Sequence, residues 1–404
     1  MIIKRDIIKN IENFLDKQSI LVLHGARQVG KTSIMLYLID KLKKNGEFVL
    51  YHDLEDYRYL EEYNKDIDSI ILFWQSLGVN KNKINYVFID EIQYLNNPSS
   101  FLKLTHDHCH FIKLIVSGSS SFEIKSKFKD SLVGRTINFE IFGLNFLEFL
   151  RFKNIKINFK KISSFQEKKL KNLWEEFSLF GTYPKIVLEP ILEKKEILLK
   201  QIISTYINKD IKDLANIRNI QKFNNLLQFL AAQSGQLLNI SELSNSLKIS
   251  ESTINEYLFI LENTYIIKKV HPYYKNIRSE LSKMPKIYFE DTGVLNIFLH
   301  KTLISAMNGI LFENSCFSHF RKIYNTDYLY FWRTNTKKEI DFIIDFIKLK
   351  AIEIKYVFRG KKDVKHLKFF ANNYKNSKTY ICTLDKRQEI DKEINFIYPW
   401  EITN

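Results

Sequence analysis

Residue types that mark secreted and membrane proteins are scarce in this chain. Its 404 residues include three cysteines, Cys109, Cys316 and Cys382, which are widely separated and form no pair at metal or redox spacing. Since small secreted domains depend on disulfides, so few cysteines favour a reducing compartment. No apolar run is long enough to cross a bilayer, and the early run at residues 20–23 is too short for a signal sequence. We therefore expect a cytoplasmic protein that does not enter a membrane.

Acidic residues are in deficit as well. The chain has 61 lysines and arginines against 46 aspartates and glutamates, which leaves a formal net charge of +15. Lysine and arginine release counterions when they neutralise phosphates, so this excess makes DNA a candidate partner. The basic residues are spread along the chain without a long block, so a general compositional bias explains the charge equally well. The length predicts two or three domains, and 45% hydrophobic residues are enough to fold them.

A glycine-rich turn lies between an apolar strand and an amphipathic helix near the N-terminus. The segment "SILVLHGARQVGKTSIMLYLIDKLKKNG", residues 19–46, matches the pattern G-x-x-x-x-G-K-[ST]. Backbone N–H groups of such a turn surround a β-phosphate at a helix N-terminus, the lysine reaches the β- and γ-phosphates, and the threonine binds Mg²⁺. The pattern therefore predicts a site for ATP and Mg²⁺. Its predicted ligands are Gly25, Gly30, Lys31, Thr32 and Ser33.

Two later apolar strands end in polar residues that suit the same site. "INYVFIDEIQ" ends a buried strand at Asp90 and Glu91, and parallel strands deliver such residues to the crevice where ligands bind. We expect Asp90 to hold Mg²⁺ through water and Glu91 to orient or deprotonate an attacking water. The next strand ends at Ser117 and Ser119, which would hydrogen-bond the γ-phosphate or that water. These residues predict ATP hydrolysis.

Four features together resemble the core of an AAA+ ATPase. They are the phosphate loop, the D-E strand, the serine-ended strand and a Gly134–Arg135 step before a last strand. The resemblance covers about residues 18–150. It implies that Arg135 is an arginine finger acting across a subunit boundary, and hence that the chain forms a homo-oligomer. The alternative is that Arg135 pairs with a carboxylate of its own chain.

The middle of the chain is predicted to be helical. Residues 151–222 contain charged helical runs and a break at "GTYP", residues 181–184, and the AAA+ resemblance implies a helical lid over the nucleotide. Residues 223–280 predict three helices and a hairpin, similar to a winged helix-turn-helix. The third helix, capped by Ser250, has several glutamates and no lysine or arginine, which favours a packing role or docking of a protein partner over base reading. Lys268 and Lys269 in the wing are the candidate phosphate contacts.

The segment "EIDFIIDFIKLKAIEIKY", residues 339–356, predicts two strands with an unusual charged face. Because side chains alternate along a strand, Glu353 and Lys355 project together, opposite the apolar side chains of the same strand. The spacing of the acids is that of the restriction-endonuclease-like fold. Asp341 is followed, after eleven residues, by the pattern E-x-K at Glu353 and Lys355, and Glu313 is the upstream acid. Glu313, Asp341 and Glu353 would hold Mg²⁺ against a phosphodiester, and Lys355 would position or help to deprotonate water. The alternative is an ordinary hairpin whose Glu–Lys pair keeps an edge strand soluble.

These residues, together with GTYP and "RSELSKMPKIYFEDTGVLNIFL" (residues 278–299), resemble a bacterial and archaeal family of AAA+ type ATP-binding proteins. That family carries a C-terminal restriction-endonuclease-like domain of unknown function. The resemblance implies an α/β fold with an AAA+ core, a helical lid, a winged helix and the C-terminal domain at residues 1–150, 151–222, 223–280 and 281–404. It implies an ATPase coupled to a nuclease-like domain that acts on or binds nucleic acid. The alternative is an ATP-driven switch whose winged helix and C-terminal domain dock a protein partner without cleavage.

Overall fold

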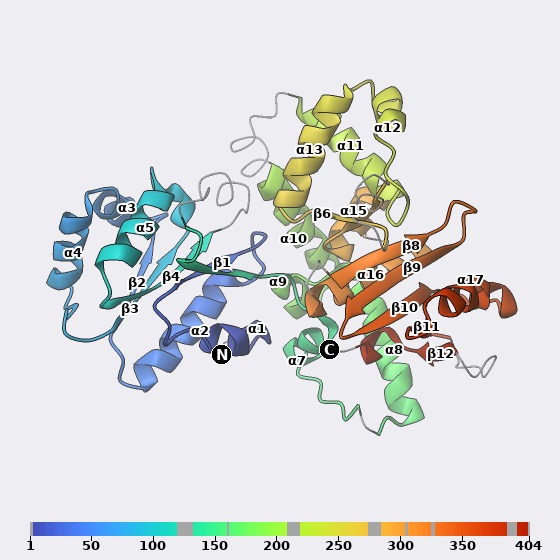
Figure 1. Cartoon of the computed structure of the whole chain (residues 1–404), viewed down its shortest axis with the longest axis horizontal. Coiled ribbons are helices and arrows are strands. Elements are labelled where there is room, and N and C mark those ends of the chain that lie inside the picture. The colour runs from blue at the N-terminus through green and yellow to red at the C-terminus, as the bar shows by residue number, and fades with distance from the viewer. Residues whose placement is uncertain are drawn as a thin grey trace. The chain divides into compact units, whose positions relative to one another are not determined.

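The computed structural model divides into two compact units, Met1–Phe142 and Gly143–Asn404 (Figure 1). It describes residues 3–118, 132–159, 161–207, 219–273, 284–303, 306–324, 328–385 and 394–402. Ser119, one of the two predicted strand-end serines, lies outside these residues.

The N-terminal unit is built on a parallel sheet of five strands in the order β2-β3-β4-β1-β5. The strands are β1 (Ile20–His24), β2 (Val49–Asp53), β3 (Asn85–Asp90), β4 (Ile112–Gly118) and β5 (Thr136–Glu140). Strand β4 lies between β1 and β3, and the three strands are parallel. The turn after β1 and the C-terminal ends of β3 and β4 therefore lie together at one end of the sheet. The predicted α/β fold with a parallel N-terminal sheet is confirmed.

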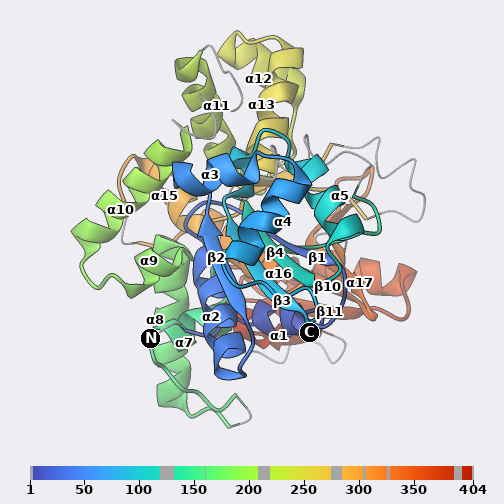
Figure 2. The same ribbon diagram turned by 90° about the vertical axis from the view of Figure 1, so that its left-hand side faces the viewer.

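Helices cover both faces of this sheet (Figures 1 and 2). On one face, Trp74 of α4 and Phe101 of α5 pack in a core with Ile20 and Val22 of β1. Helices α1 and α2 lie on the other face. Among the described residues of this unit, the helices are α1 (Ile7–Glu12), α2 (Lys31–Lys44), α3 (Tyr57–Tyr63), α4 (Ile67–Ser76), the short η1 (Ile92–Tyr94) and α5 (Pro98–His108).

The C-terminal unit begins with four helices, α7 (Phe146–Phe152), α8 (Ser164–Phe180), α9 (Pro184–Leu188) and α10 (Leu192–Thr205). Helix α8 packs against α15 (Thr292–His300) and α16 (Gly309–Ile323). The GTYP turn between α8 and α9 is held by the Asp291 carboxylate, which accepts hydrogen bonds from Thr182 N at 2.7 Å and Thr182 Oγ1 at 2.8 Å. Gly181 has φ +80°, and a Cβ there would overlap that carboxylate, so the turn requires glycine. Asp291 also caps α15 through Val294 N at 3.1 Å.

A three-helix segment follows, made of α11 (Ile220–Ala232), α12 (Ile240–Leu247) and α13 (Glu251–Asn263). Ser250 caps α13 by accepting a hydrogen bond from Thr253 N at 3.3 Å, as the sequence predicted. Strand β6 (Ile267–Val270) comes next and pairs antiparallel with β7 (Lys286–Phe289). The strand paired with β6 is therefore in the region assigned from sequence to the next domain.

The last part of the chain forms a mixed sheet in the order β12-β11-β10-β9-β8. Its strands are β8 (Leu329–Arg333), β9 (Glu339–Phe346), β10 (Lys348–Ile354), β11 (Lys378–Cys382) and β12 (Ile394–Ile397), and the short η4 (Pro399–Glu401) follows. Strands β8, β9 and β10 are antiparallel, while β10, β11 and β12 are parallel. Helix α17 (Lys361–Asn373) packs on one face. Helix α16 packs on the other.

Helices assigned from sequence to the lid share a core with this C-terminal sheet. Trp174 and Phe177 of α8 belong to the same buried cluster as Phe317 of α16 and Phe342 of β9. Residues 143–404 accordingly form one compact unit, and the finer division at residues 222 and 280, like the lid role, stays a prediction. Within the described part of the chain, no helix combines the length and apolar character needed to span a membrane.

Candidate nucleotide site and a second polar cluster

The phosphate loop owes its shape to residues with positive φ. Gly25 has φ +154°, and a Cβ there would overlap the carbonyl oxygen of Ile141, which follows β5. Gln28 has φ +61°, and Gly30 has φ +102° as the residue that caps α2. Such a turn directs backbone N–H groups into a concavity at a helix N-terminus. The loop is therefore shaped to bind an anion.

Lys31 lies across this loop. It is the first residue of α2, and its Nζ donates hydrogen bonds to the carbonyl oxygens of Gly25 at 3.0 Å and Ala26 at 2.8 Å. Its positive charge is thus held within the anion-binding turn. Thr32 and Ser33 follow on the exposed side of the first helical turn.

The Asp90 carboxylate is the centre of the polar contacts at the edge of the sheet. Its Oδ2 accepts hydrogen bonds from Thr32 Oγ1 at 2.6 Å and from the Tyr51 hydroxyl at 3.3 Å. Its Oδ1 accepts from the Ser117 hydroxyl and from Glu91 N at 3.1 Å. Burial, and then the charge of Asp90, raise the pKa of Tyr51, so this phenol remains a donor. The hydroxyl and carboxylate oxygens of Thr32 and Asp90 are the ligand type that Mg²⁺ prefers, so these residues fit the predicted ion.

Glu91 and Ser117 also lie at this edge. Glu91 adopts a left-handed backbone with φ +56°, and its carboxylate accepts a hydrogen bond from the Gln93 side-chain amide. Ser117 is fully buried, and its hydroxyl is engaged with Asp90. The sequence predicted that this hydroxyl bonds the γ-phosphate or the attacking water, and this role stays a prediction. What the structure adds is that Ser117 orients Asp90.

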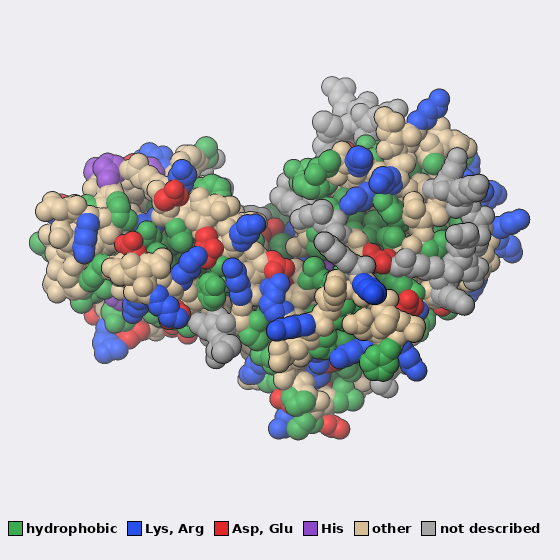
Figure 3. All heavy atoms as spheres, turned by 90° about the horizontal axis from the view of Figure 1, so that it is seen from below, with side chains coloured by type: hydrophobic (Ala, Val, Ile, Leu, Met, Phe, Trp, Pro, Cys, Tyr) green, Lys and Arg blue, Asp and Glu red, His purple; other side chains and the backbone are tan. Residues whose placement is uncertain are grey.

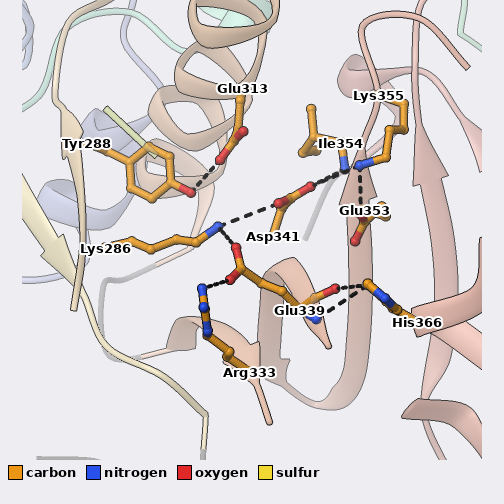
Figure 4. A network of polar contacts seen from close by, with 10 residues as sticks. All are labelled: Lys286, Tyr288, Glu313, Arg333, Glu339, Asp341, Glu353, Ile354, Lys355 and His366. Carbon is orange, nitrogen blue, oxygen red and sulfur yellow. Dashed lines mark hydrogen bonds and ion pairs between the residues drawn. The ribbon is translucent and has the colours of Figure 1, made fainter. Parts of the chain in front are cut away.

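Asp341, Glu353 and Lys355 meet where β9 and β10 separate (Figure 4). The ladder between the two strands ends at the pair Phe342 and Ile352, and beyond it Asp341 Oδ2 accepts a hydrogen bond from Ile354 N at 2.9 Å. Lys355 Nζ lies 2.7 Å from Glu353 Oε1 and 3.9 Å from Asp341 Oδ2. Glu353 and Lys355 thus point to the same side, as the alternation of side chains predicted.

A lysine that the sequence did not single out completes this cluster. Lys286 of β7 places Nζ 2.6 Å from Glu339 Oε1 and 3.6 Å from Asp341 Oδ1 (Figure 4). Arg333 NH1 lies 2.6 Å from Glu339 Oε2. Glu313 accepts a hydrogen bond from the Tyr288 hydroxyl at 2.7 Å.

Of the three metal ligands predicted for this cluster, Asp341 and Glu353 lie beside ammonium groups and Glu313 accepts from a hydroxyl. Among the described residues, no group of three histidine, cysteine, aspartate or glutamate side chains could hold a metal ion. Both oxygens of Asp341 face donors, and the Lys286 charge lies beside one of them. Metal binding by Glu313, Asp341 and Glu353 therefore stays a prediction. Their spacing in the sequence did not reveal the lysine that another strand places beside Asp341.

Burial sets the protonation of this cluster. Burial, and then the charge of Asp341, raise the pKa of Glu353 to about 8 and that of Glu313 to about 7. Burial lowers the pKa of Lys286, but the negative charges of Glu313, Asp341 and Glu339 outweigh it, and the net shift is upward. At neutral pH the lysine is therefore charged, while the Glu353 carboxyl is mostly protonated.

Three family models match the chain. Residues 17–150 match a family described as an AAA domain, in the region that carries the phosphate loop and the D-E strand. This region is similar to AAA-type P-loop domains, and residues 17–150 are called the AAA domain below. Residues 171–303 and 308–402 match two families described as domains of unknown function, DUF8612 and DUF4143.

Similar chains in other organisms extend over most of this one. An uncharacterized protein of Methanocaldococcus jannaschii is 28% identical over 386 residues, which are 93% of this chain and 82% of the relative. An uncharacterized protein of Haemophilus influenzae is 28% identical over 369 residues, 88% of this chain and 86% of the relative. Among solved structures, a Walker-type ATPase of Pyrococcus abyssi aligns with a TM-score of 0.48 and 14% identity, covering 74% of this chain and 96% of that one.

Arg135 of the AAA domain is paired within its own chain. Its guanidinium binds the Asp107 carboxylate through Nε at 2.8 Å and NH2 at 3.0 Å, and the hydrogen bonds from Arg135 and then His106 lower the pKa of Asp107. Arg135 directly precedes β5, whose first residue pairs with Ile20 at the start of β1, so it lies at the sheet edge opposite the phosphate loop. The structure contains the second of the two roles considered for Arg135, an ion pair with a carboxylate of its own chain. Action on a neighbouring subunit stays a prediction.

Arg5 supports the AAA domain's phosphate loop and was missed by sequence reasoning. The buried guanidinium donates from NH1 to the carbonyl oxygen of Val29 and from NH2 to that of Phe142, each at 2.9 Å. It thereby ties the start of the chain to the loop and to the end of the unit. No local pattern around residue 5 marks this contact.

The raised pKa of Glu353 predicts a pH-dependent loss of stability. The native carboxyl keeps its proton to about pH 8, whereas the unfolded one loses it near its ordinary pKa of 4.5. The free energy of unfolding therefore falls as pH rises between these values. The contribution approaches about 1.4 kcal/mol per pH unit. Urea unfolding at pH 5.5 and 7.5 should show this fall for the wild type relative to Glu353→Gln. Glu256→Gln, at an exposed site of α13, is the matched control, and parallel curves for wild type and Glu353→Gln would contradict the assignment.

Proposed function

We propose that the chain hydrolyses ATP with Mg²⁺ at the AAA domain and couples this to binding of nucleic acid by the C-terminal unit. The observation that carries the first part is the contact of Thr32 Oγ1 with Asp90 Oδ2 at 2.6 Å, beside a phosphate loop that contains Lys31. A threonine and an aspartate from separate elements meet there next to an anion site. A nucleoside triphosphate bound with Mg²⁺ requires this arrangement.

The residues divide the chemistry as follows. The loop N–H groups and Lys31 bind the β- and γ-phosphates, and Thr32 and Asp90 would hold Mg²⁺, which neutralises phosphate charge when bound. Glu91 orients a water and accepts its proton as the water oxygen bonds to the γ-phosphorus. The bond from that phosphorus to the β–γ bridging oxygen breaks, and ADP leaves with the electron pair. Ser117, Tyr51 and the backbone of Glu91 keep Asp90 in place.

The case for nucleic acid rests on the net charge of +15 and on the topology of the last sheet. The order α16, three antiparallel strands, α17 and a parallel strand supports a restriction-endonuclease-like fold. On the face shown in Figure 3, lysine and arginine side chains are scattered and do not gather in one patch. We therefore propose backbone contacts without base reading, and no cleavage while Lys286 lies beside Asp341.

A protein partner is the second candidate, and α13 favours it. The wing lysines Lys268 and Lys269 both lie near Glu262 of α13, at 3.0 and 3.6 Å, which offsets their charge toward phosphates. The same helix presents the Phe259 ring to solvent with 55% exposure, among exposed glutamates. A protein partner that packs on this helix would cover the ring.

The test is the rate of ATP hydrolysis with and without nucleic acid. We expect duplex or single-stranded DNA to raise phosphate release, the effect to weaken as salt increases, and the DNA to stay intact with Mg²⁺ or Mn²⁺. Lys31→Ala gives the background rate. An unchanged rate together with no DNA binding at low salt would favour the protein-docking function.

A further inference from the structure

Lys286 is a buried cation that the proposed chemistry does not use. Its side chain is 3% exposed and comes from β7, whereas the acids around it belong to α16 and β9. Lysines are rarely buried unless they are paired. Lys286 is paired with Glu339 at 2.6 Å and with Asp341 at 3.6 Å (Figure 4).

The position of the ammonium decides what else Asp341 can bind. The Lys286 ammonium lies near Asp341 Oδ1, and the Lys355 ammonium lies near Oδ2, which also accepts from Ile354 N. Each carboxylate oxygen therefore has a cation beside it. A divalent ion on Oδ1 would lie within a few ångströms of the ammonium. Like charges repel strongly at that separation in a buried site, so the two cations exclude each other.

One oxygen in the cluster lacks a partner. Glu353 Oε2 is buried and makes no hydrogen bond with the residues that the structure describes, and the residue is 7% exposed. Buried carboxyl oxygens normally have a partner. Because the Glu353 carboxyl is mostly protonated at neutral pH, a divalent ion at this oxygen would take the place of its proton. The oxygens of Asp341 and Glu353 are the ligands that Mg²⁺ and Mn²⁺ take.

We propose that the Lys286 ammonium is a built-in cation that takes the place of a divalent metal ion at Asp341, and that the cluster binds a metal once this charge is withdrawn. The inference rests on the proposed nuclease-like character of the C-terminal unit, and it does not depend on ATP hydrolysis. Lys286 pairs with Val270 of β6, which directly follows α13. The blocking charge therefore lies on the two-stranded sheet that follows the three-helix segment, whereas Asp341 and Glu353 lie on the five-stranded sheet.

The test is Mn²⁺ binding by the nucleotide-free full chain, measured by calorimetry and by electron paramagnetic resonance of free Mn²⁺. Lys286→Met keeps the length of the side chain and removes its charge. We expect this variant to bind one more Mn²⁺ per chain than the wild type. The dissociation constant of that ion should be at least tenfold lower than that of any Asp341-dependent Mn²⁺ binding in the wild type. Adding Asp341→Asn or Glu353→Gln to it should remove the extra ion.

Lys350→Met is the matched control, because Lys350 lies on β10 and donates to the Tyr324 hydroxyl, away from the acids. It should leave the metal count unchanged. Lys286→Gln, which keeps a donor for Glu339, provides a second uncharged variant should Lys286→Met fold poorly, and folding of each is checked by urea unfolding. A folded uncharged variant without an extra ion, or equally tight Asp341-dependent binding in the wild type, would overturn the proposal. Lack of ATP hydrolysis would overturn the proposed ATPase and leave this metal count as it is.

Discussion

Lys31→Ala is expected to abolish ATP binding, whereas Glu91→Gln should bind ATP like the wild type and hydrolyse it about 10²–10⁴-fold more slowly. The reason is their positions. Lys31 supplies the positive charge inside the phosphate loop, while Glu91 lies at the end of β3 with its carboxylate held by Gln93. Calorimetric titration with ATP and a phosphate-release assay separate the two effects.

Lys41→Ala is the control for changes in α2, since Lys41 pairs with Glu12 at 2.8 Å on the exposed side of the same helix. It should bind and hydrolyse ATP normally. Equal loss of ATP binding in Lys31→Ala and Glu91→Gln would contradict the roles assigned to them.

Asp291→Ala is expected to lower the free energy of unfolding of the C-terminal unit by about 3–5 kcal/mol. The buried carboxylate accepts three hydrogen bonds, two from Thr182 and one from Val294 N, and its removal leaves these donors without an acceptor. The GTYP turn and the start of α15 would both lose their support. Urea unfolding followed by circular dichroism measures the change.

Asn239→Ala is the matched control, because Asn239 caps α12 in the same unit at an exposed position, through Glu242 N at 3.2 Å. Loss of such a cap costs about 1 kcal/mol. A similar small loss for Asp291→Ala would mean that the turn and the helix are not held by this carboxylate.

The nucleotide site was predictable because its parts are local in sequence. The phosphate loop is one contiguous turn, and Asp90 follows an apolar strand whose end must lie at the edge of a parallel sheet. Glycine conformations and strand direction then bring Lys31, Thr32 and Asp90 together without further information. Arg5 was not predictable, because its contact with Val29 depends on how the first helix folds back on the sheet.

The second cluster was only half predictable, for a related reason. Strand alternation places Glu353 and Lys355 on one side, and an antiparallel pair brings Asp341 to them. Lys286 reaches them from β7, more than fifty residues earlier, and no periodicity connects the two segments. The same limit applies to α8. Its pattern predicts a helix, but not that Trp174 shares a core with Phe342.

ATP hydrolysis by the AAA domain is measured as phosphate release by the purified full chain. With ATP and Mg²⁺ we expect multiple turnovers per chain, reduced to background by EDTA and in Lys31→Ala. A wild-type chain that is folded and binds ATP with Mg²⁺, yet releases no more phosphate than Lys31→Ala with or without nucleic acid, would contradict the account.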